Sequence, residues 1–194
     1  IAGTEHEWAA HIARIDTGNT GEMAVVGAKG RDYAREMADW ERVMVRYESL
    51  LGLSTETKSS LPSVGKTKTI HQLLPSFAYG DAISNEAIRI RDWLRTAGYR
   101  SEIFARFFDP RVIHQGRLYE NGVIPSADGL LYHHSIGSEI TSAAVAHPGP
   151  KGLIYHNITP AEFFQPYRPE FAPLLRHGRE ELWTLAHSFP VSVG

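Results

Sequence analysis

The pattern of apolar and polar residues in the second half of the chain predicts a strand, a loop and a helix in succession. A short apolar run at 70–74 is typical of a buried strand, and a loop rich in helix-breaking residues follows at 75–80. Asp81 then occupies an N-cap position, and Gly98 occupies the position of a C-cap glycine. Between them, Arg91 lies off the apolar face of the predicted helix. That face consists of Ile83, Ala87, Ile90, Leu94 and Ala97.

Further strand and helix patterns follow along the chain. Residues 99–104 predict a second strand, whereas 107–127 lacks periodicity and predicts a long loop with one helical turn. A helix is expected at about 169–186, and 191–194 resembles the first residues of another strand. Strands therefore alternate with helices, which is the pattern of an α/β domain.

Two near-duplicate segments, GLLYHH at 129–134 and GLIYHN at 152–157, predict two more strands. A helix expected at 138–146 joins them, so the three elements predict a βαβ unit with parallel strands and a right-handed crossover. We therefore predict a doubly wound, mostly parallel, Rossmann-like sheet. In such a sheet a ligand binds outside the carboxyl ends of the strands, where Gly80 and Asp81 are also expected. A glycine-containing loop before a helix also favours an anion, because free backbone N–H groups point toward it there.

The first part of the chain differs from the Rossmann-like part. Residues 1–51 predict a helical segment, with a strong amphipathic helix within 22–51. Its apolar stripe consists of Trp40, Val43, Met44, Tyr47, Leu50 and Leu51. Residues 52–67 are rich in Ser, Thr, Gly, Pro and Lys and predict a linker. The predicted organisation is therefore a helical segment, a linker and a truncated α/β domain at 68–194.

Composition narrows the class of protein. An apolar fraction of 42%, a charged fraction of 22% and a net charge of −2 are ordinary for a soluble globular protein. Basic residues are scattered, so we expect no nucleic-acid partner. No window approaches about 18 uninterrupted apolar residues, the N-terminus lacks the features of a signal peptide, and cysteine is absent. These features predict a cytoplasmic protein; peripheral association with a membrane stays open, but nothing indicates it. The chain does not begin with Met, and we expect it to be part of a longer protein.

Ten histidines are a high count for this length, and three of them follow the duplicated apolar runs. His133 and His134 are adjacent on a predicted strand and therefore point to opposite faces, so they do not readily chelate one ion. No carboxylate stands at a helical ligand spacing from either, and we predict no metal site. Two interpretations stay open for this pair: hydrogen-bonded structural residues, or members of an acceptor pocket at the strand ends.

His156 ends the second duplicated run and enters the sequence NITPAEFF. Asn157, Thr159 and Glu162 add polar groups just past the predicted strand end. A polar cluster at a strand end is typical of a substrate pocket. We therefore predict that His156 binds a substrate or takes part in catalysis and that the three polar residues line the same pocket. We also expect His156 and Gly80 to open onto one crevice.

Residues 68–194 resemble the N-terminal, acceptor-side domain of family-4 retaining glycosyltransferases of the GT-B type, although the domain is incomplete. The resemblance rests on three segments, IHQLLPSFAYGDAISNEAIRIRDWL, LLYHHSIGSE and LIYHNITPAEFF. It implies transfer of a hexose, often mannose or glucose, from a nucleotide-diphosphate sugar as co-substrate, with no separate cofactor. Gly80 and Asp81 would then lie beside the donor diphosphate, and His156 beside the transferred sugar. The resemblance also implies that no protein nucleophile attacks and that the donor phosphate takes the acceptor proton.

Residues 22–51 resemble the C-terminal tail of the same family, with a Gly-Arg-x-Tyr and a later Trp-Glu-Arg. The chain would then contain the end of one unit, a linker and the start of a second, an order that a tandem or circularly permuted protein gives. The donor-binding domain, which this half of an active site needs as its partner, is missing. We therefore expect no transferase turnover from these 194 residues alone. Two other function classes stay open, a non-catalytic α/β binding module and a nucleotide-sugar epimerase-like domain.

Overall fold

The computed structural model describes residues 24, 25, 27–29, 32, 67–120, 122 and 124–193. The chain divides into two compact units, Ile1–Ser49 and Leu50–Gly194. In the first unit the six described residues are helical. The predicted amphipathic stripe and the predicted linker lie outside the described residues, apart from Thr67.

The described strands and helices of the second unit follow the predicted alternation. The strands are β1 Ile70–Phe77, β2 Ile103–Phe108, β3 Arg117–Leu118, β4 Gly129–His134, β5 Lys151–Tyr155 and β6 Val191–Val193. The α-helices are α4 Ala82–Thr96, α5 Thr141–Ala146 and α6 Ala172–Ser188. Two short 3-10 helices, η2 Pro110–Gln115 and η3 Ala161–Phe163, follow β2 and β5. The two strands predicted from the duplicated segments, the helices on either side of β5 and the last strand are confirmed, with small shifts at their ends.

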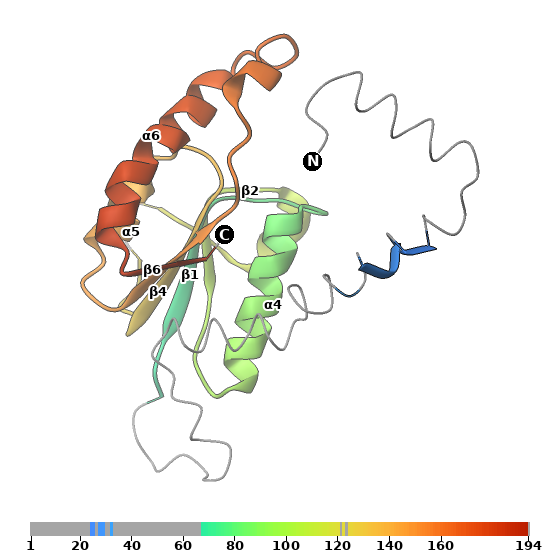
Figure 1. The fold of residues 1–194 in the computed structure, drawn as a ribbon. Helices are drawn as coiled ribbons and strands as arrows, with labels where there is room; N and C mark the ends of the chain where they lie inside the picture. The colour runs from blue at the N-terminus through green and yellow to red at the C-terminus, as the bar shows by residue number, and fades with distance from the viewer. Residues whose placement is uncertain are drawn as a thin grey trace. The chain divides into compact units, whose positions relative to one another are not determined.

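The described residues of the second unit form one sheet of six parallel strands in the order β3-β2-β1-β4-β5-β6. This order is that of a Rossmann-type sheet, and it reverses between β1 and β4. Helix α4 covers one face of the sheet, and α5 and α6 cover the other (Figure 1). The prediction of a doubly wound, parallel, Rossmann-like fold is therefore confirmed.

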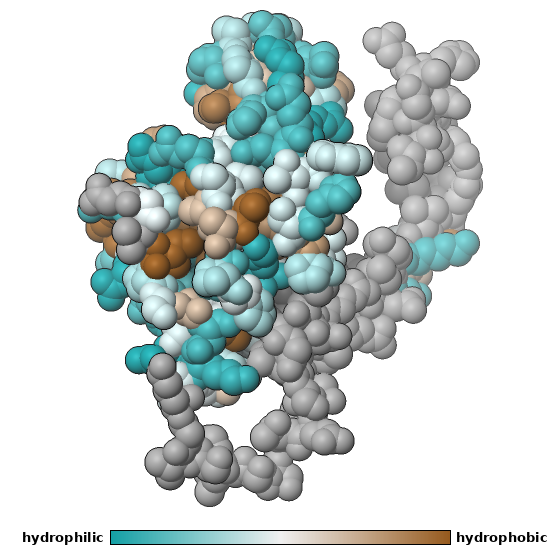
Figure 2. Space-filling view, turned by 90° about the vertical axis from the view of Figure 1, so that its left-hand side faces the viewer, coloured by the Kyte–Doolittle hydropathy of each residue, from teal (hydrophilic) through white to brown (hydrophobic). Residues whose placement is uncertain are grey.

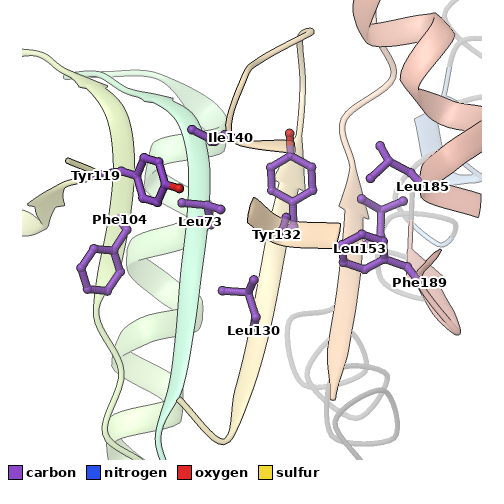
Figure 3. Close-up of a cluster of buried hydrophobic side chains, with 10 residues drawn as sticks. Leu73, Phe104, Tyr119, Leu130, Tyr132, Ile140, Leu153, Leu185 and Phe189 are labelled. Atoms are coloured by element: carbon purple, nitrogen blue, oxygen red, sulfur yellow. The ribbon is translucent and has the colours of Figure 1, made fainter. Parts of the chain in front are cut away.

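Alternation along the strands divides the buried side chains between the two faces of the sheet. Leu73 belongs to a cluster on the α5 and α6 face, whereas its neighbour Leu74 belongs to a cluster on the α4 face. Figure 3 shows the first cluster, in which strand side chains meet Leu185 of α6 and Phe189 just beyond it. Full burial of one large apolar side chain contributes about 1.5–3 kcal/mol. On the outer surface of the α6 side, hydrophobic residues show mainly across the middle (Figure 2).

Strand β1 extends to Phe77, past Pro75, so the loop that follows it is shorter than predicted. In a parallel strand the N–H groups of successive residues point to opposite neighbours, and those of Ile70 and Gln72 donate to the β2 side. The backbone nitrogen of residue 75 therefore points toward β4. The pairing of β1 with β4 has already ended there, since Leu73 is the last paired residue of β1. Because no ladder partner is lost there, proline is tolerated inside this strand.

The second strand begins later than the predicted 99–104. Tyr99 still belongs to the end of α4, where its N–H donates to the Leu94 carbonyl, and Arg100 forms an isolated bridge with Thr69. The pairing of β2 with β1 begins at Ile103. The second strand is therefore confirmed but its predicted start was wrong, because Tyr99 completes the end of α4. The predicted long loop after this strand also contains η2 and β3.

Helix α4 is closed at both ends as predicted. The Asp81 carboxylate accepts hydrogen bonds from the backbone nitrogen and the Oγ of Ser84, both at 2.8 Å. Gly98 has φ +89, and the N–H groups of Gly98 and Tyr99 donate back to carbonyls of the last turn, which is a Schellman motif. The two caps satisfy backbone groups that the helix itself leaves unpaired.

The buried face of α4 differs from the prediction: Ser84 is buried and Ile83 only half-buried, and the far end of the helix differs as well. Ala97 is exposed, whereas Arg91 is buried. The Arg91 guanidinium donates to the backbone and side-chain oxygens of Gln115 at 2.5 and 3.2 Å, and it also pairs with Asp92. Helical periodicity misses such a residue, because a long side chain can bury its stem and still satisfy its charge at a loop distant in sequence.

Helix α6 and the loop after β4 approach each other closely at two glycines. A Cβ atom on Gly178 would lie 2.5 Å from the backbone nitrogen of Gly137 and 2.7 Å from Ile158 Cδ1. The N–H of Gly137 donates to the Leu174 carbonyl of α6 at 3.0 Å. The missing side chains therefore let backbone meet backbone at this contact.

Replacing the cap of α4 tests how far it stabilises the fold. We expect Asp81→Ala to lower the free energy of unfolding by about 1 kcal/mol, because the Ser84 N–H loses its acceptor. Asp81→Asn is the matched control and should retain most of the stability, since asparagine caps helices about as well as aspartate. Urea denaturation followed by circular dichroism measures both variants. Equal losses in the two would contradict the capping role.

A methyl group at the glycine contact should destabilise the fold. We expect Gly178→Ala to lower the free energy of unfolding by about 1–3 kcal/mol, because the methyl overlaps the Gly137 backbone. At an open helix position the same change would instead stabilise by about 1 kcal/mol. Thr184→Ala, at an exposed position of the same helix, is the control and should change stability little. A urea midpoint for Gly178→Ala at or above that of the wild type would show that the contact is not tight.

Candidate functional site

The carboxyl ends of β1, β4 and β5 lie at one edge of the sheet, at and beside the point where the strand order reverses. Ligands bind at this edge in sheets of this type. His133 lies near the end of β4, and His156 directly follows β5. Helix α4 begins at the same edge, after the loop that contains Gly80. The parallel topology therefore places Gly80, His133 and His156 at the same end of the sheet.

A chain of hydrogen bonds crosses the α4 face of the sheet at this edge. The Gln72 side-chain nitrogen lies 3.0 Å from the Ala87 carbonyl oxygen of α4. Gln72 Oε1 lies 2.9 Å from His133 Nε2, and His133 Nδ1 lies 3.0 Å from His156 Nε2. The two imidazole rings are nearly parallel, with 7° between their planes. We call Gln72, His133 and His156 the histidine relay; it connects β1, β4 and the end of β5, and it is anchored on α4.

Burial sets the charge of the relay. Gln72 and His133 are fully buried, whereas 13% of the His156 side chain is exposed. Burial lowers the pKa of His133 well below its ordinary value of 6.5, and the neighbouring His156 lowers it further. Burial also lowers the pKa of His156, although the Glu86 and Asp81 carboxylates oppose that shift. Both imidazoles are therefore neutral at neutral pH.

The exposed end of the relay faces acidic side chains of α4. Glu86 Oε2 lies 3.8 Å from His156 Nδ1, and 30% of the Glu86 side chain is exposed. Asp81 also acts on the charge of His156, but its carboxylate is held by Ser84 as the helix cap. A neutral imidazole beside a carboxylate can hydrogen-bond a polar ligand group. The structure gives Asp81 a capping role, and its place beside a donor diphosphate stays a prediction.

Gly80, with φ +76, lines a pocket of about 400 Å³ together with residues of α4 and η2. Asn85 and Arg111 are among the other residues that line it. His156 is not one of them. The crevice predicted to join Gly80 and His156 is therefore not this pocket, although both residues lie at the same end of the sheet.

The structure places His134 on the opposite face of the sheet, against α6. Its Nε2 donates to the Gly178 carbonyl at 2.8 Å, and its Nδ1 lies 3.4 Å from the Tyr132 hydroxyl. That hydroxyl lies 2.8 Å from Thr141 Oγ1 of α5. The predicted alternation of the two adjacent histidines is confirmed. His134 is fully buried and hydrogen-bonded, so the structural interpretation describes it, and the fold does not bring it together with His156.

Asn157, Thr159 and Glu162 have exposed side chains on the connection from β5 through η3. Asn157 has φ +26, and the buried Ile158 holds the connection in place between its exposed neighbours. Within the described part of the chain, no hydrogen bond joins these three side chains to His156. Their place in an acceptor pocket stays a prediction.

Two residues of the site, Gln72 and Glu86, were missed in the sequence. Gln72 is a polar residue inside the apolar run at 70–74, and a polar group in a buried strand requires a hydrogen-bond partner. The polar residue within an apolar strand was therefore sufficient to identify Gln72 as a candidate site residue. Glu86 gives no such signal, because helical periodicity does not distinguish it from a carboxylate that faces solvent.

Within the residues that the structure describes, no group of three or more His, Cys, Asp or Glu could hold a metal ion. Over the same residues, none of the helices combines the length and hydrophobicity that crossing a bilayer requires. Comparisons of the chain with models of known families, with curated proteins and with solved structures gave no match.

The buried histidines make the stability of the fold depend on pH. Histidine in the unfolded chain is protonated below about pH 6.5, whereas burial keeps the His133 pKa below that value in the fold. The unfolded state then binds more protons, so the free energy of unfolding should fall as the pH decreases below about 6.5. Each histidine that stays neutral contributes a slope of about 1.4 kcal/mol per pH unit. The pKa values of four other histidines shift in the same direction, those of His71, His134, His147 and His156.

We expect His133→Gln to reduce this slope by about 1.4 kcal/mol per pH unit, because one neutral buried imidazole is removed. Urea denaturation at a series of pH values between about 5 and 7 measures the slope. Leu131→Ala, at a buried position of the same strand, is the control, since it destabilises the fold but leaves the histidines in place. It should keep the wild-type slope. Identical slopes in the wild type and His133→Gln would contradict the assignment of a neutral His133.

Proposed function

We propose that this chain is the acceptor-side part of a retaining glycosyltransferase. The enzyme would transfer a hexose such as mannose or glucose from a nucleotide-diphosphate sugar to a glycan or another acceptor. A donor-binding domain, elsewhere in the same protein, would complete the active site. The proposal rests on the sequence resemblance and on the geometry at the carboxyl end of the sheet.

The observation that carries the proposal is the histidine relay. A buried polar group that is left unpaired costs about 1–3 kcal/mol, and apolar residues would stabilise the same position without that risk. Gln72 and His133 nevertheless occupy the interior, and their hydrogen bonds lead to His156. His156 reaches the edge at which Rossmann-type sheets bind nucleotides. A polar ring held in one place at that edge supports a role in holding a substrate.

In the proposed reaction the protein positions the substrates and stabilises charge, and no side chain attacks the sugar. The acceptor oxygen forms a bond to the anomeric carbon as the bond to the donor phosphate breaks, and the acceptor proton passes to that phosphate. His156 would hold a hydroxyl group of the transferred sugar. Gly80 would let the diphosphate approach the backbone at the start of α4, where free N–H groups favour anions. Asp81 keeps that helix end in place through Ser84.

The acceptor would bind along the connection that follows β5. Asn157, Thr159 and Glu162 are exposed there, next in sequence to His156. An exposed polar segment suits a large hydrophilic acceptor such as a glycan, because hydroxyl groups of the acceptor can replace water as hydrogen-bond partners.

A second candidate is a non-catalytic α/β binding module, and one observation favours it. The pocket of about 400 Å³ that Gly80 lines also contains Arg111 and His114 but not His156. Arg111 already pairs with the Asp109 carboxylate, so a small polar ligand would meet a compensated cation in this pocket, and it would not reach the histidine relay.

Titration with nucleotide sugars, followed by NMR of the labelled chain, separates the two candidates. We expect GDP-mannose or UDP-glucose to bind, and His156→Ala to weaken binding about two- to tenfold, since one hydrogen bond contributes about 0.5–1.5 kcal/mol. His114→Ala, in the Gly80 pocket, is the matched control and should change the affinity little. Sensitivity at His114 with indifference at His156 would support the binding module. No response of the His156 signals to any nucleotide sugar, in this chain and in the full-length protein that includes the donor-binding domain, would contradict the transferase proposal.

A further inference from the structure

Helix α4 fixes the orientation of the Gln72 side chain. A backbone carbonyl only accepts hydrogen bonds, so the Gln72 atom 3.0 Å from the Ala87 oxygen must be the amide nitrogen. The opposite orientation would place two acceptor oxygens against each other in a fully buried position. Gln72 Oε1 therefore faces His133 Nε2, at 2.9 Å.

This orientation determines which nitrogen of His133 carries its hydrogen. An amide oxygen only accepts, so His133 Nε2 carries the hydrogen and donates it to Gln72. Burial lowers the pKa of His133 and keeps the ring neutral, and a neutral imidazole has one N–H. His133 Nδ1 is therefore an acceptor. His156 Nε2, 3.0 Å away, must carry a hydrogen and donate it to that atom.

We infer that Gln72 and His133 are positioning residues that hold His156 in its Nε2–H tautomer and leave its Nδ1 as a hydrogen-bond acceptor. The Ala87 carbonyl orients the Gln72 amide, the amide sets the tautomer of His133, and His133 sets the tautomer of His156. In histidine, the hydrogen bond made by one ring nitrogen decides the state of the other. The inference uses only hydrogen bonds and burial within the chain, so it holds whether or not the chain transfers a sugar.

The groups around His156 Nδ1 determine which kind of ligand group can bind beside this atom. The Glu86 carboxylate lies 3.8 Å from Nδ1, and the Asp81 carboxylate also acts on the ring. Carboxylate oxygens and an unprotonated ring nitrogen are all acceptors. A ligand group that meets Nδ1 must therefore donate a hydrogen bond, as a hydroxyl or an ammonium does, and a phosphate oxygen would meet acceptors there. The identity of that donor as a sugar hydroxyl rests on the proposed function.

The test is NMR of the ¹⁵N-labelled full chain without ligand, at about pH 7.5, where neutral histidines dominate. Ring nitrogens with and without hydrogen differ widely in ¹⁵N shift, and a hydrogen bond between two nitrogens transmits a scalar coupling. We expect a coupling between His133 Nδ1 and His156 Nε2, and unprotonated Nδ1 atoms in both rings. A hydrogen on Nδ1 of either ring would overturn the inference.

Gln72→Leu tests whether Gln72 sets the tautomer or only fills space. Without the amide oxygen, His133 loses its reason to keep the hydrogen on Nε2, and we expect the Nδ1–H tautomer of His156 to appear beside Glu86. An unchanged His156 in this variant would overturn the positioning role of Gln72. Leu74→Val, on the same strand and on the α4 face, is the control and should keep the wild-type tautomers. If Gln72→Leu does not fold, the wild-type coupling still decides the inference.

Discussion

The hydrogen bond between the Gln72 amide and the Ala87 carbonyl joins the central strand to helix α4, and the site depends on it. Gln72 is fully buried, so breaking this bond would leave polar groups without water as a substitute, at a cost of about 1–3 kcal/mol. The same amide orders His133 and, through it, His156. The position of a helix, the interior of the sheet and a ring at its edge are thus linked by one polar contact.

Strand β4 supplies a polar network to each face of the sheet. His134 donates to the Gly178 carbonyl and contacts Tyr132, whose hydroxyl lies near Thr141, and its Nδ1 also lies 4.0 Å from Glu181 Oε2 of α6. His133 belongs to a network that leads outward to His156. Both histidines are fully buried and both use Nε2 toward an oxygen, so their chemistry in the strand is alike. The two histidines differ in where their neighbours lie: those of His134 are on α5 and α6, whereas His133 contacts His156 at the carboxyl end of the sheet.

Local signals were sufficient to predict most of the fold. The caps at Asp81 and Gly98 and the duplicated apolar runs depend on neighbouring residues, and the structure has helix ends and parallel strands where they predict them. The errors concern residues whose partners are distant in sequence, such as Arg91, which is buried against a later segment. In the candidate site, too, local patterns were predictable and contacts between distant residues were not. The strand-end histidines could be located from pattern, whereas the partnership of Gln72 and Glu86 with them arises from the packing of α4 on the sheet.

Pro75 has a consequence for the space between the two central strands. The pairing of β1 with β4 stops at Leu73, and the next backbone nitrogen on that side belongs to the proline, which has no hydrogen to donate. Pro75 therefore cannot donate a further ladder hydrogen bond to β4. The pairing of β4 with β1 therefore ends one residue before His133, whereas its pairing with β5 continues through His133 and His134.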